Sequence, residues 1–235
     1  MSMPFANPRA GRWAAATGVL VLSATIAFVF VYPARCGHDG IAFRTAARRL
    51  NQLKNRDSTP QRADVDSSVT LEAMLAPGYD RWRWREDRAA SIVGYVRYVR
   101  IGDVEAVNCY GLHPRNRDTY ILLVAEPTCT DSTPRVTIEV TPRWRARMRQ
   151  RGVDWSTGAL KERLLGRKVR ATGWVLFDAP NEDASQHTAV HPSLTARTTA
   201  WELHPVTGIE LVVEPSGADG AAPAAEQENE VRGPS

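Results

Sequence analysis

Two short segments of the sequence alternate arginine with tryptophan, a combination suited to binding nucleic acid or another polyanion. They are DRWRWREDR (residues 80–88) and PRWRARMRQR (residues 142–151). Arginines attract phosphates and aromatic rings stack on bases, each stacked base contributing about 1–3 kcal/mol. The candidate ligand-binding residues are Arg83, Trp84, Arg115, Arg117, Trp144 and Arg145. The alternative is that the tryptophans are core residues and the arginines are solvated, and a net charge of +4 does not decide between the two.

Asp118 and His204 are the residues that could exchange a proton. They form an acid–base pair only if the fold brings their two segments together, and the alternative is that each has a structural role, in a turn or a backbone hydrogen bond. The sequence contains no P-loop, dinucleotide fingerprint or nucleophile elbow. We therefore expect no catalytic residues and no cofactor, and we keep a hydrolase using Asp118 and His204 as an alternative.

Cysteines and histidines offer a disulfide or a zinc site. Cys109 and Cys129 could pair in an oxidising compartment, although the strand expected between them spans about 30 Å. Cys36 would then remain as a free thiol or pair with another chain. The zinc-type ligands are Cys109, His113, Cys129, His187, His191 and His204. Their spacing matches no CxxC or HExxH pattern, so we expect no metal site.

Five strands and one helix must position these residues. Alternating or continuous apolar patterns predict strands at residues 91–101, 119–126, 135–142, 168–178 and 199–213, the last interrupted at His204-Pro205. A helical pattern covers residues 144–165 and ends at Gly166. A mainly β, five-stranded OB-like barrel has its helix between strands 3 and 4. Gly94 and Gly173 fall where such strands bend. Another small barrel or a β-sandwich is the alternative.

A membrane anchor is expected before this domain. Residues 13–34 carry no formal charge, and Trp13 and Tyr32 lie close to the two ends of this stretch. That length suits a bilayer core of about 30 Å, and such rings favour the headgroup region. The alternative is a cleaved signal peptide, which would have a shorter apolar run and a small-residue cleavage site.

The orientation of the anchor follows from its flanks, which give conflicting indications. Arginines after the anchor, including Arg35, Arg44, Arg48 and Arg49, place the domain in the cytoplasm by the positive-inside rule. A short basic tail before an apolar helix is instead typical of an uncleaved export signal. We expect an extracytoplasmic domain on a single-pass inner-membrane anchor, with the reverse orientation as the alternative.

The chain thus divides into five regions. These are a short basic tail (1–12), the transmembrane helix (13–34), a polar juxtamembrane segment and linker (35–68), the OB-like barrel (69–214) and a disordered tail (215–235). Apolar residues at helical spacing predict a short amphipathic helix within residues 42–55. The final region lacks large apolar residues apart from one valine.

Several stretches resemble a family of uncharacterised bacterial membrane-anchored proteins with an OB-like domain. They are VTLEAMLAPG (69–78), VGYV (93–96), RDTYILL (117–123), IEVTPRW (138–144), VRATGWVLFD (169–178) and WELHPVTGIE (201–210). The resemblance covers most of residues 69–212. It implies the fold, but no activity and no catalytic residues.

These observations predict a membrane-anchored binding or interaction module rather than an enzyme. Its partners would be an envelope protein or an anionic envelope polymer, bound by the loops at residues 103–117 and 179–198, where OB barrels bind ligands. The alternative is a cytoplasm-facing, membrane-tethered protein that binds single-stranded nucleic acid.

Overall fold

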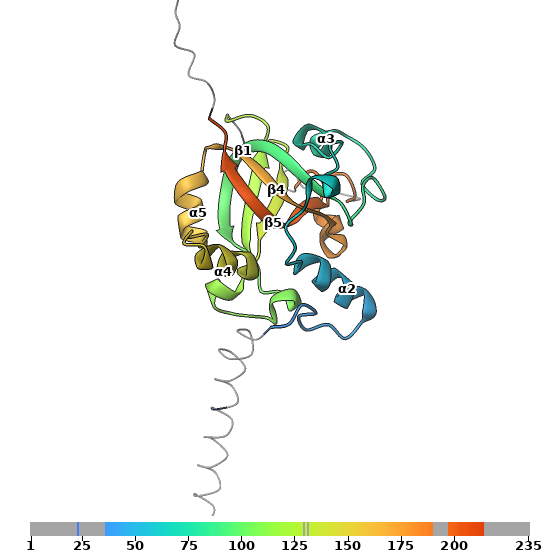
Figure 1. Ribbon diagram of the computed structural model, residues 1–235. Helices are drawn as coiled ribbons and strands as arrows, with labels where there is room; N and C mark the ends of the chain where they lie inside the picture. Colours follow the sequence, from blue (N-terminus) through green and yellow to red (C-terminus); the bar gives the residue numbers. More distant parts are fainter. Residues whose placement is uncertain (1–22, 24–35, 129, 131, 190–196, 214–235) are drawn as a thin grey trace, which may run out of the picture.

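The computed structural model describes residues 23, 36–128, 130, 132–189 and 197–213, and its centre is a closed five-stranded barrel (Figure 1). The strands are β1 (Ala89–Ile101), β2 (Thr119–Val124), β3 (Val136–Val140), β4 (Lys168–Phe177) and β5 (Trp201–Leu211). Around the barrel their order is β1-β2-β3-β5-β4, and β4 pairs with β1 to close it. Every pair is antiparallel except β3 with β5, which is parallel. The prediction of a mainly β, five-stranded barrel is confirmed.

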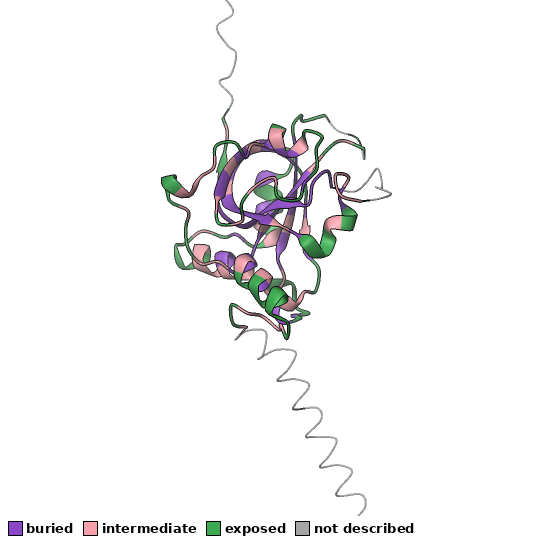
Figure 2. Ribbon diagram, turned by 90° about the vertical axis from the view of Figure 1, so that its right-hand side faces the viewer, coloured by how far each residue is buried: buried purple, intermediate pink, exposed green. Residues whose placement is uncertain are grey.

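Alternation along the strands separates the barrel interior from its outer face. In β3, Val136, Ile138 and Val140 are fully buried in the core, and in β5 Trp201 and Leu203 join them. Figure 2 shows the strands as a mostly buried ring. Burying these side chains contributes roughly 1.5–3 kcal/mol each, which makes the interior the main source of stability.

Short helices cover the barrel, and the predicted helix at residues 144–165 is in fact two. These are α4 (Pro142–Gln150) and α5 (Thr157–Leu164), separated by a turn in which Gly152 has a φ of +79°. That left-handed conformation suits glycine and stops α4. Trp144 from α4 and Leu160 and Leu164 from α5 enter the core. The third helix of this shell, α3 (Leu71–Leu75), contributes Leu71 and Met74.

The predicted break at His204-Pro205 is wrong, because β5 runs continuously through it. Proline has no N–H to donate, and the pairing of β4 with β5 shifts register on either side of Gly173 to accommodate this. A Cβ on Gly173 would lie 2.7 Å from the Pro205 carbonyl oxygen. Glycine at 173 thus allows the close approach of the two strands.

Residues 36–68, expected as a polar segment and linker, pack against the barrel. They contain α2 (Thr45–Lys54), within the predicted helical stretch, and a 3-10 turn, η3 (Arg62–Asp64). Polar bonds hold the segment: Trp144 Nε1 donates to the Arg56 carbonyl and Trp174 Nε1 donates to the Ser58 carbonyl, both at 2.9 Å. Residues 36–68 are therefore packed on the barrel rather than forming a free linker.

The disulfide partner of Cys109 is Cys36, so the expected Cys109–Cys129 pair is wrong. The Cα atoms of Cys36 and Cys109 are 5.8 Å apart. Cys109 follows a 3-10 turn, η4 (Ala106–Asn108), in the loop between β1 and β2. The strand pattern could not reveal this pair because the partner comes from the segment before the barrel. Cys129 lies outside the described residues.

The transmembrane helix predicted at residues 13–34 lies outside the described residues, apart from Ser23. Within the described part of the chain, no helix combines the length and the hydrophobicity that crossing a membrane requires. The basic tail at residues 1–12 and the predicted disordered tail at residues 215–235 also lie outside the described residues.

We predict that Cys36→Ser lowers the free energy of unfolding by up to about 4 kcal/mol, because the bond closes a loop with a sequence separation of 73 residues. Urea unfolding of the full-length chain measures this loss. Cys129→Ser is the control, since it leaves the Cys36–Cys109 bond intact. Equal stability of the Cys36→Ser chain and the wild type would contradict the prediction, as would a non-reducing peptide map that links Cys109 to Cys129.

Candidate functional site

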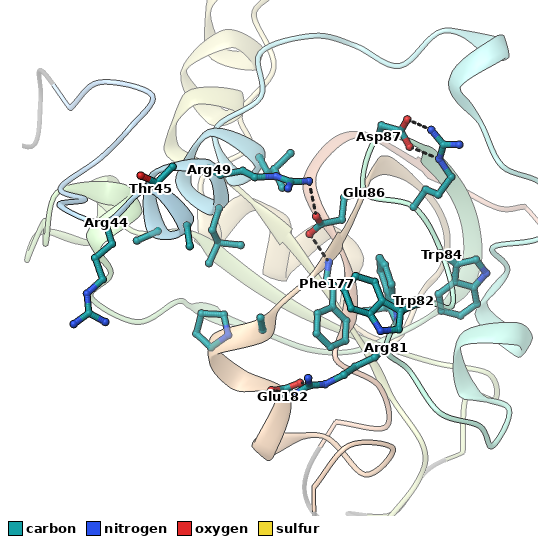
Figure 3. Close-up of a pocket in the computed structure, with 18 residues that line it drawn as sticks. Arg44, Thr45, Arg49, Arg81, Trp82, Trp84, Glu86, Asp87, Phe177 and Glu182 are labelled. Carbon is teal, nitrogen blue, oxygen red and sulfur yellow. Dashed lines mark hydrogen bonds and ion pairs between the residues drawn. The ribbon is translucent and has the colours of Figure 1, made fainter.

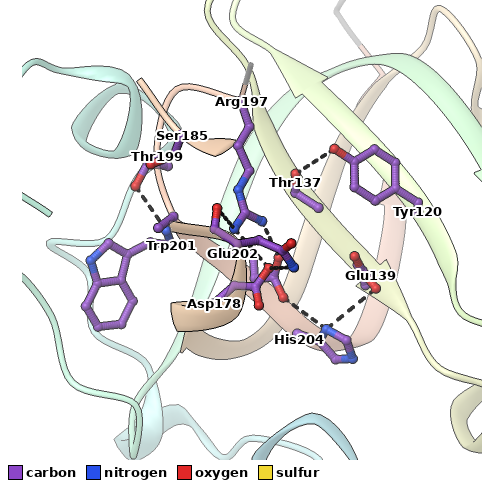
Figure 4. A network of polar contacts seen from close by, with 12 residues as sticks. Tyr120, Thr137, Glu139, Asp178, Ser185, Arg197, Thr199, Trp201, Glu202 and His204 are labelled. Carbon is purple, nitrogen blue, oxygen red and sulfur yellow. Dashed lines mark hydrogen bonds and ion pairs between the residues drawn. The ribbon is translucent and has the colours of Figure 1, made fainter. Parts of the chain in front are cut away.

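Charged and polar residues occupy the outer face of β2, β3 and β5. Ile138 of β3 lies opposite Leu203 of β5, and both point into the core. Their neighbours Glu139 and His204 consequently lie side by side on the other face, where Asp118, at the start of β2, joins them. The same outer face carries Thr137, Tyr120 and Glu202 (Figure 4). The barrel thus brings together Asp118 and His204, the pair that the sequence could only suggest.

We call Lys54, Asp118, Glu139, Asp178, Arg197, Glu202 and His204 the buried polar cluster. His204 Nδ1 and Glu202 Oε1 share a hydrogen bond of 3.1 Å, and Arg197 donates to Glu202 Oε2 at 3.0 Å and to Asp178 Oδ2 at 2.9 Å. Asn108 Nδ2 donates to Asp118 Oδ2 at 2.9 Å. Figure 4 shows Glu139 and Glu202 converging on the His204 ring. The cluster is therefore a connected network drawn from α2, β3, β5 and the β1–β2 and β4–β5 loops.

Burial controls the protonation of this cluster. His204 and Glu202 are 0% exposed. Desolvation, followed by the nearby Lys54 ammonium, lowers the pKa of His204 to about 4, so the imidazole is neutral at pH 7. Desolvation, followed by the Asp178 carboxylate, raises the pKa of Glu202 to about 7. Burial likewise raises the pKa of Asp118 and raises that of Glu139 well above its usual range.

Lys54 is the cation that α2 inserts into this face. Its Nζ lies 3.4 Å from Glu105 Oε1 and 3.8 Å from Asp178 Oδ1. Burial alone would lower the pKa of Lys54, but the surrounding carboxylates, with Asp178 the strongest, outweigh burial and raise it. α2, the β1–β2 loop and the β4–β5 loop cover the cluster, which explains why charged groups outside the barrel are as buried as its core.

A second feature, which we call the aromatic groove, opens beside the cluster between α2, residues 81–87 and residues 177–182. Its volume is about 1260 Å³. Trp82, Trp84 and Phe177 line the groove (Figure 3), together with Trp201 and with Leu50 and Leu53 of α2. Trp84 and Phe177 both pack against Trp201, with ring centroids 5.6 and 5.2 Å away. The apolar face of α2 thus lines the groove, whereas the buried residues of this helix are the polar Asn51 and Lys54.

Asp80 fixes the loop that carries the groove tryptophans. Its Oδ2 accepts hydrogen bonds from Thr199 Oγ1 at 2.7 Å and from the Ala200 N–H at 2.8 Å. Oδ1 lies 3.0 Å from His187 Nδ1, and the Asp80 carbonyl accepts from Trp201 Nε1 at 2.7 Å. Asp80 is 0% exposed. This one carboxylate therefore joins residues 80–85 to the start of β5.

Trp82 stands at the tip of that loop. It is 91% exposed and has a φ of +67°, a conformation that bulky side chains rarely adopt. Its neighbours are held on both sides: Arg81 pairs with Glu182, and Arg83 donates to the Ala73 carbonyl at 2.6 Å. Strained backbone that its surroundings enforce is concentrated at functional sites. Exposure and strain together single out Trp82 as a candidate contact residue.

The charges around the groove largely neutralise one another. Arg81 pairs with Glu182, Arg85 with Asp87, and Arg49 lies 3.6 Å from Glu86. Three of the arginines lining the groove thus already have acidic partners. The groove is apolar at its walls and electrically balanced at its rim.

The candidate ligand-binding residues separate into three groups. Trp84 lines the groove, and Arg83 stacks its guanidinium 4.5 Å above the Trp84 ring. Trp144 and Arg145 are structural: Trp144 is buried in the core, and Arg145 donates to Thr119 Oγ1 and to backbone carbonyls of the β1–β2 loop.

Arg117 and Arg115 form the third group, away from the groove. Arg117 donates to the Gly102 carbonyl at 2.8 Å. Arg115 is exposed and lines a smaller hollow of about 560 Å³ beside α4. Arg145 lines the same hollow and donates to the Arg115 and Arg117 carbonyls. These three arginines therefore lie together, whereas Arg83 stacks on Trp84 at the aromatic groove.

The zinc-type ligands named from the sequence also separate. Cys109 is in the disulfide, His113 accepts a hydrogen bond from the Arg115 N–H, and His187 contacts Asp80. His191 and Cys129 lie outside the described residues. The residues that do converge on His204 are carboxylates, Asp118 and Glu139. Sequence reasoning missed Glu139 because an acidic residue between two apolar ones in a strand reads as solvent-facing.

Comparison with known proteins gives no independent guide to function. No family model matches the chain, and no curated protein matches it.

We predict that Asp80→Asn lowers the free energy of unfolding by about 2–4 kcal/mol, because two buried hydrogen bonds lose their charged acceptor. Thermal or urea unfolding of the full-length chain measures the change. Asp103→Asn is the matched control, since its side chain is 77% exposed and its loss should change stability by at most about 0.5 kcal/mol. Equal effects of the two substitutions would show that Asp80 does not hold the loop.

Proposed function

We propose that this protein is a membrane-anchored binding module with an OB-like barrel, and that the aromatic groove binds an apolar segment of a partner protein. The observation that carries the proposal is Trp82, a large aromatic side chain 91% exposed over an apolar groove. Exposed apolar surface of this kind marks interaction sites, because leaving it in water is unfavourable without a partner.

The OB-like assignment is supported by the strand order β1-β2-β3-β5-β4 and by the helices between β3 and β4. In OB barrels the face of strands 2 and 3, with the loops β1–β2 and β4–β5, binds oligonucleotides or oligosaccharides. Here α2 and those same loops cover that face, and its side chains include Asp118 and Glu139. Carboxylates there would repel phosphates, which favours a protein partner over a nucleic acid.

The size and chemistry of the groove favour a polypeptide segment as the ligand. Its volume of about 1260 Å³ exceeds the roughly 300–1,000 Å³ of most small-molecule sites. Ion pairs at the rim leave little net positive charge to attract an anionic polymer. Aromatic-lined grooves bind extended, proline-containing or apolar segments, whose side chains fill the spaces between rings.

An extracytoplasmic position of the domain is supported by the Cys36–Cys109 disulfide. Such bonds persist in oxidising compartments and are rare in the cytosol. The partner would then be an envelope protein. A hydrolase using Asp118 and His204 has less support, because both side chains are almost fully buried and a substrate could not reach them without displacing α2.

We predict that random peptides of about 12 residues, selected on full-length chain in detergent, will be apolar or proline-rich and bind in the groove. Trp82→Ala should weaken their binding at least about tenfold, since buried tryptophans commonly dominate interfaces. Fluorescence anisotropy of labelled peptides measures the affinities. Leu112→Ala is the control, because Leu112 is also exposed but lies in the β1–β2 loop.

The groove would not be the binding site if peptides bound wild type and Trp82→Ala equally, or if the selection yielded no binding peptides. Single-stranded DNA at low salt is tested in parallel. Salt-sensitive DNA binding that Trp84→Ala abolishes would instead support the nucleic-acid alternative.

We predict that alkaline phosphatase fused after Glu214 is active in cells, because export lets the reporter form its disulfides. A cytoplasm-active reporter at the same position is the control and should be inactive. An inactive phosphatase fusion together with an active cytoplasmic reporter would place the domain in the cytoplasm. Disulfide bonds are rare in that compartment.

A further inference from the structure

Asp118, Glu139 and His204 form a ligand set of two carboxylates and one imidazole. Each offers an atom that lies within 4.8 Å of the others. His204 Nε2 is 3.9 Å from Asp118 Oδ2. Two atoms at that distance can both contact one cation at about 2.0–2.2 Å. The three residues come from β3, β5 and the residue before β2, so the barrel itself fixes their spacing.

Two atoms of this set have no hydrogen-bond partner in the described part of the chain. They are Asp118 Oδ1 and His204 Nε2, in side chains that are almost completely buried. Buried polar atoms are nearly always bonded, and each unsatisfied one costs roughly 1–3 kcal/mol. An ionised Glu202 can only accept a hydrogen bond from His204 Nδ1, and that tautomer leaves Nε2 with a lone pair. Asp118 Oδ1, as part of a carboxylate, and His204 Nε2 could then both donate an electron pair to a cation.

The surrounding bonds orient these atoms as the outer shell of a metal site does. The Nδ1–H of His204 donates to Glu202, which Arg197 holds in turn, and Asn108 holds Asp118 Oδ2. A carboxylate behind the imidazole fixes its tautomer and strengthens the opposite nitrogen as a ligand.

The charges of the cluster also leave room for a cation. Among the described residues, the carboxylates of Glu105, Asp118, Glu139, Asp178 and Glu202 outnumber Lys54, Arg145 and Arg197, the cations that act on them. Lys54 lies against Glu105 and Asp178, and Arg197 against Asp178 and Glu202. Among the described residues, neither Lys54 nor Arg197 forms an ion pair with Asp118 or Glu139. The Glu139 side chain is 13% exposed and gives the site contact with solvent.

We propose that Asp118, Glu139 and His204 bind a divalent first-row transition-metal cation. Carboxylates and an imidazole together suit Mn²⁺, Fe²⁺ or Zn²⁺ rather than Cu⁺, which prefers thiolates. Three protein ligands leave at least one coordination position for water. The cation would join β3, β5 and the β1–β2 loop beneath α2, a role distinct from that of the aromatic groove.

Mn²⁺ is the probe, because it avoids competition from the Cys129 thiol. Full-length chain in detergent is treated with a chelator, dialysed and titrated with Mn²⁺, and loss of the EPR signal of hydrated Mn²⁺ reports binding. We expect one ion per chain, a rise in the unfolding temperature and, in pulsed EPR, modulation from an imidazole nitrogen. The unfolding temperature rises only if the folded state binds the ion more tightly than the unfolded state does.

Asp118→Asn and His204→Gln should each weaken Mn²⁺ binding at least about tenfold, and Glu202→Gln should do so by about 10–100-fold through His204. Asp103→Asn and His113→Gln are matched controls on exposed residues and should bind as wild type. Asp118→Asn removes a buried negative charge, so the metal-free variant should remain folded and yet lose the stabilisation by Mn²⁺.

Three results would overturn the proposal. They are Mn²⁺ that stays hydrated at millimolar concentrations, bound Mn²⁺ without nitrogen modulation, and binding that a folded Asp118→Asn chain retains. The nitrogen signal is measured on wild type, so the proposal stays testable if a variant fails to fold. Peptide binding to the groove is a separate measurement, and its failure leaves this site unaffected.

Discussion

The parallel pairing of β3 with β5 is the constraint on which the remaining structure depends. It joins β1, β2 and β3 to β5 and β4, and it sets Ile138 opposite Leu203 in the core. Because side chains alternate, the same register sets Glu139 beside His204 on the outer face. A one-residue shift of β5 against β3 would turn Leu203 out of the core and Glu202 and His204 into it. Hydrophobic packing inside therefore determines the position of the charged groups outside.

Those charged groups explain why the segment before the barrel is folded onto it. A face with this many carboxylates would be well solvated if it were exposed, and covering it is unfavourable without compensating charge. α2 supplies that charge through Lys54, and the disulfide and tryptophan N–H bonds hold the segment in place. Because Lys54 faces the buried polar cluster, Leu50 and Leu53 on another face of α2 line the aromatic groove. One helix thus links the buried polar cluster to the proposed binding surface.

The sequence was most informative where a local pattern decides the structure. Alternating apolar residues predicted all the strands of the barrel, and the helical pattern after β3 located α4 and α5, though not the turn at Gly152 between them. Asp118 and His204 were recognised as a pair conditional on the fold. Contacts between distant segments were beyond local patterns: Cys36 with Cys109, Lys54 with Asp178, and Asp80 with the start of β5. Each joins residues more than 70 positions apart, which only the closed barrel brings together.

The Cys36–Cys109 bond also determines how the domain would respond to mechanical load. Residues 36–109 form a covalent loop that contains α2, α3 and the whole of β1. A pulling force on the chain before Cys36 passes through the sulfur atoms to Cys109 and on towards β2, bypassing everything within the loop. α2 therefore carries none of the tension and stays packed on the barrel while the chain before Cys36 is pulled. Reduction of the bond would direct that force through α2, which would then be the first helix to detach from the barrel.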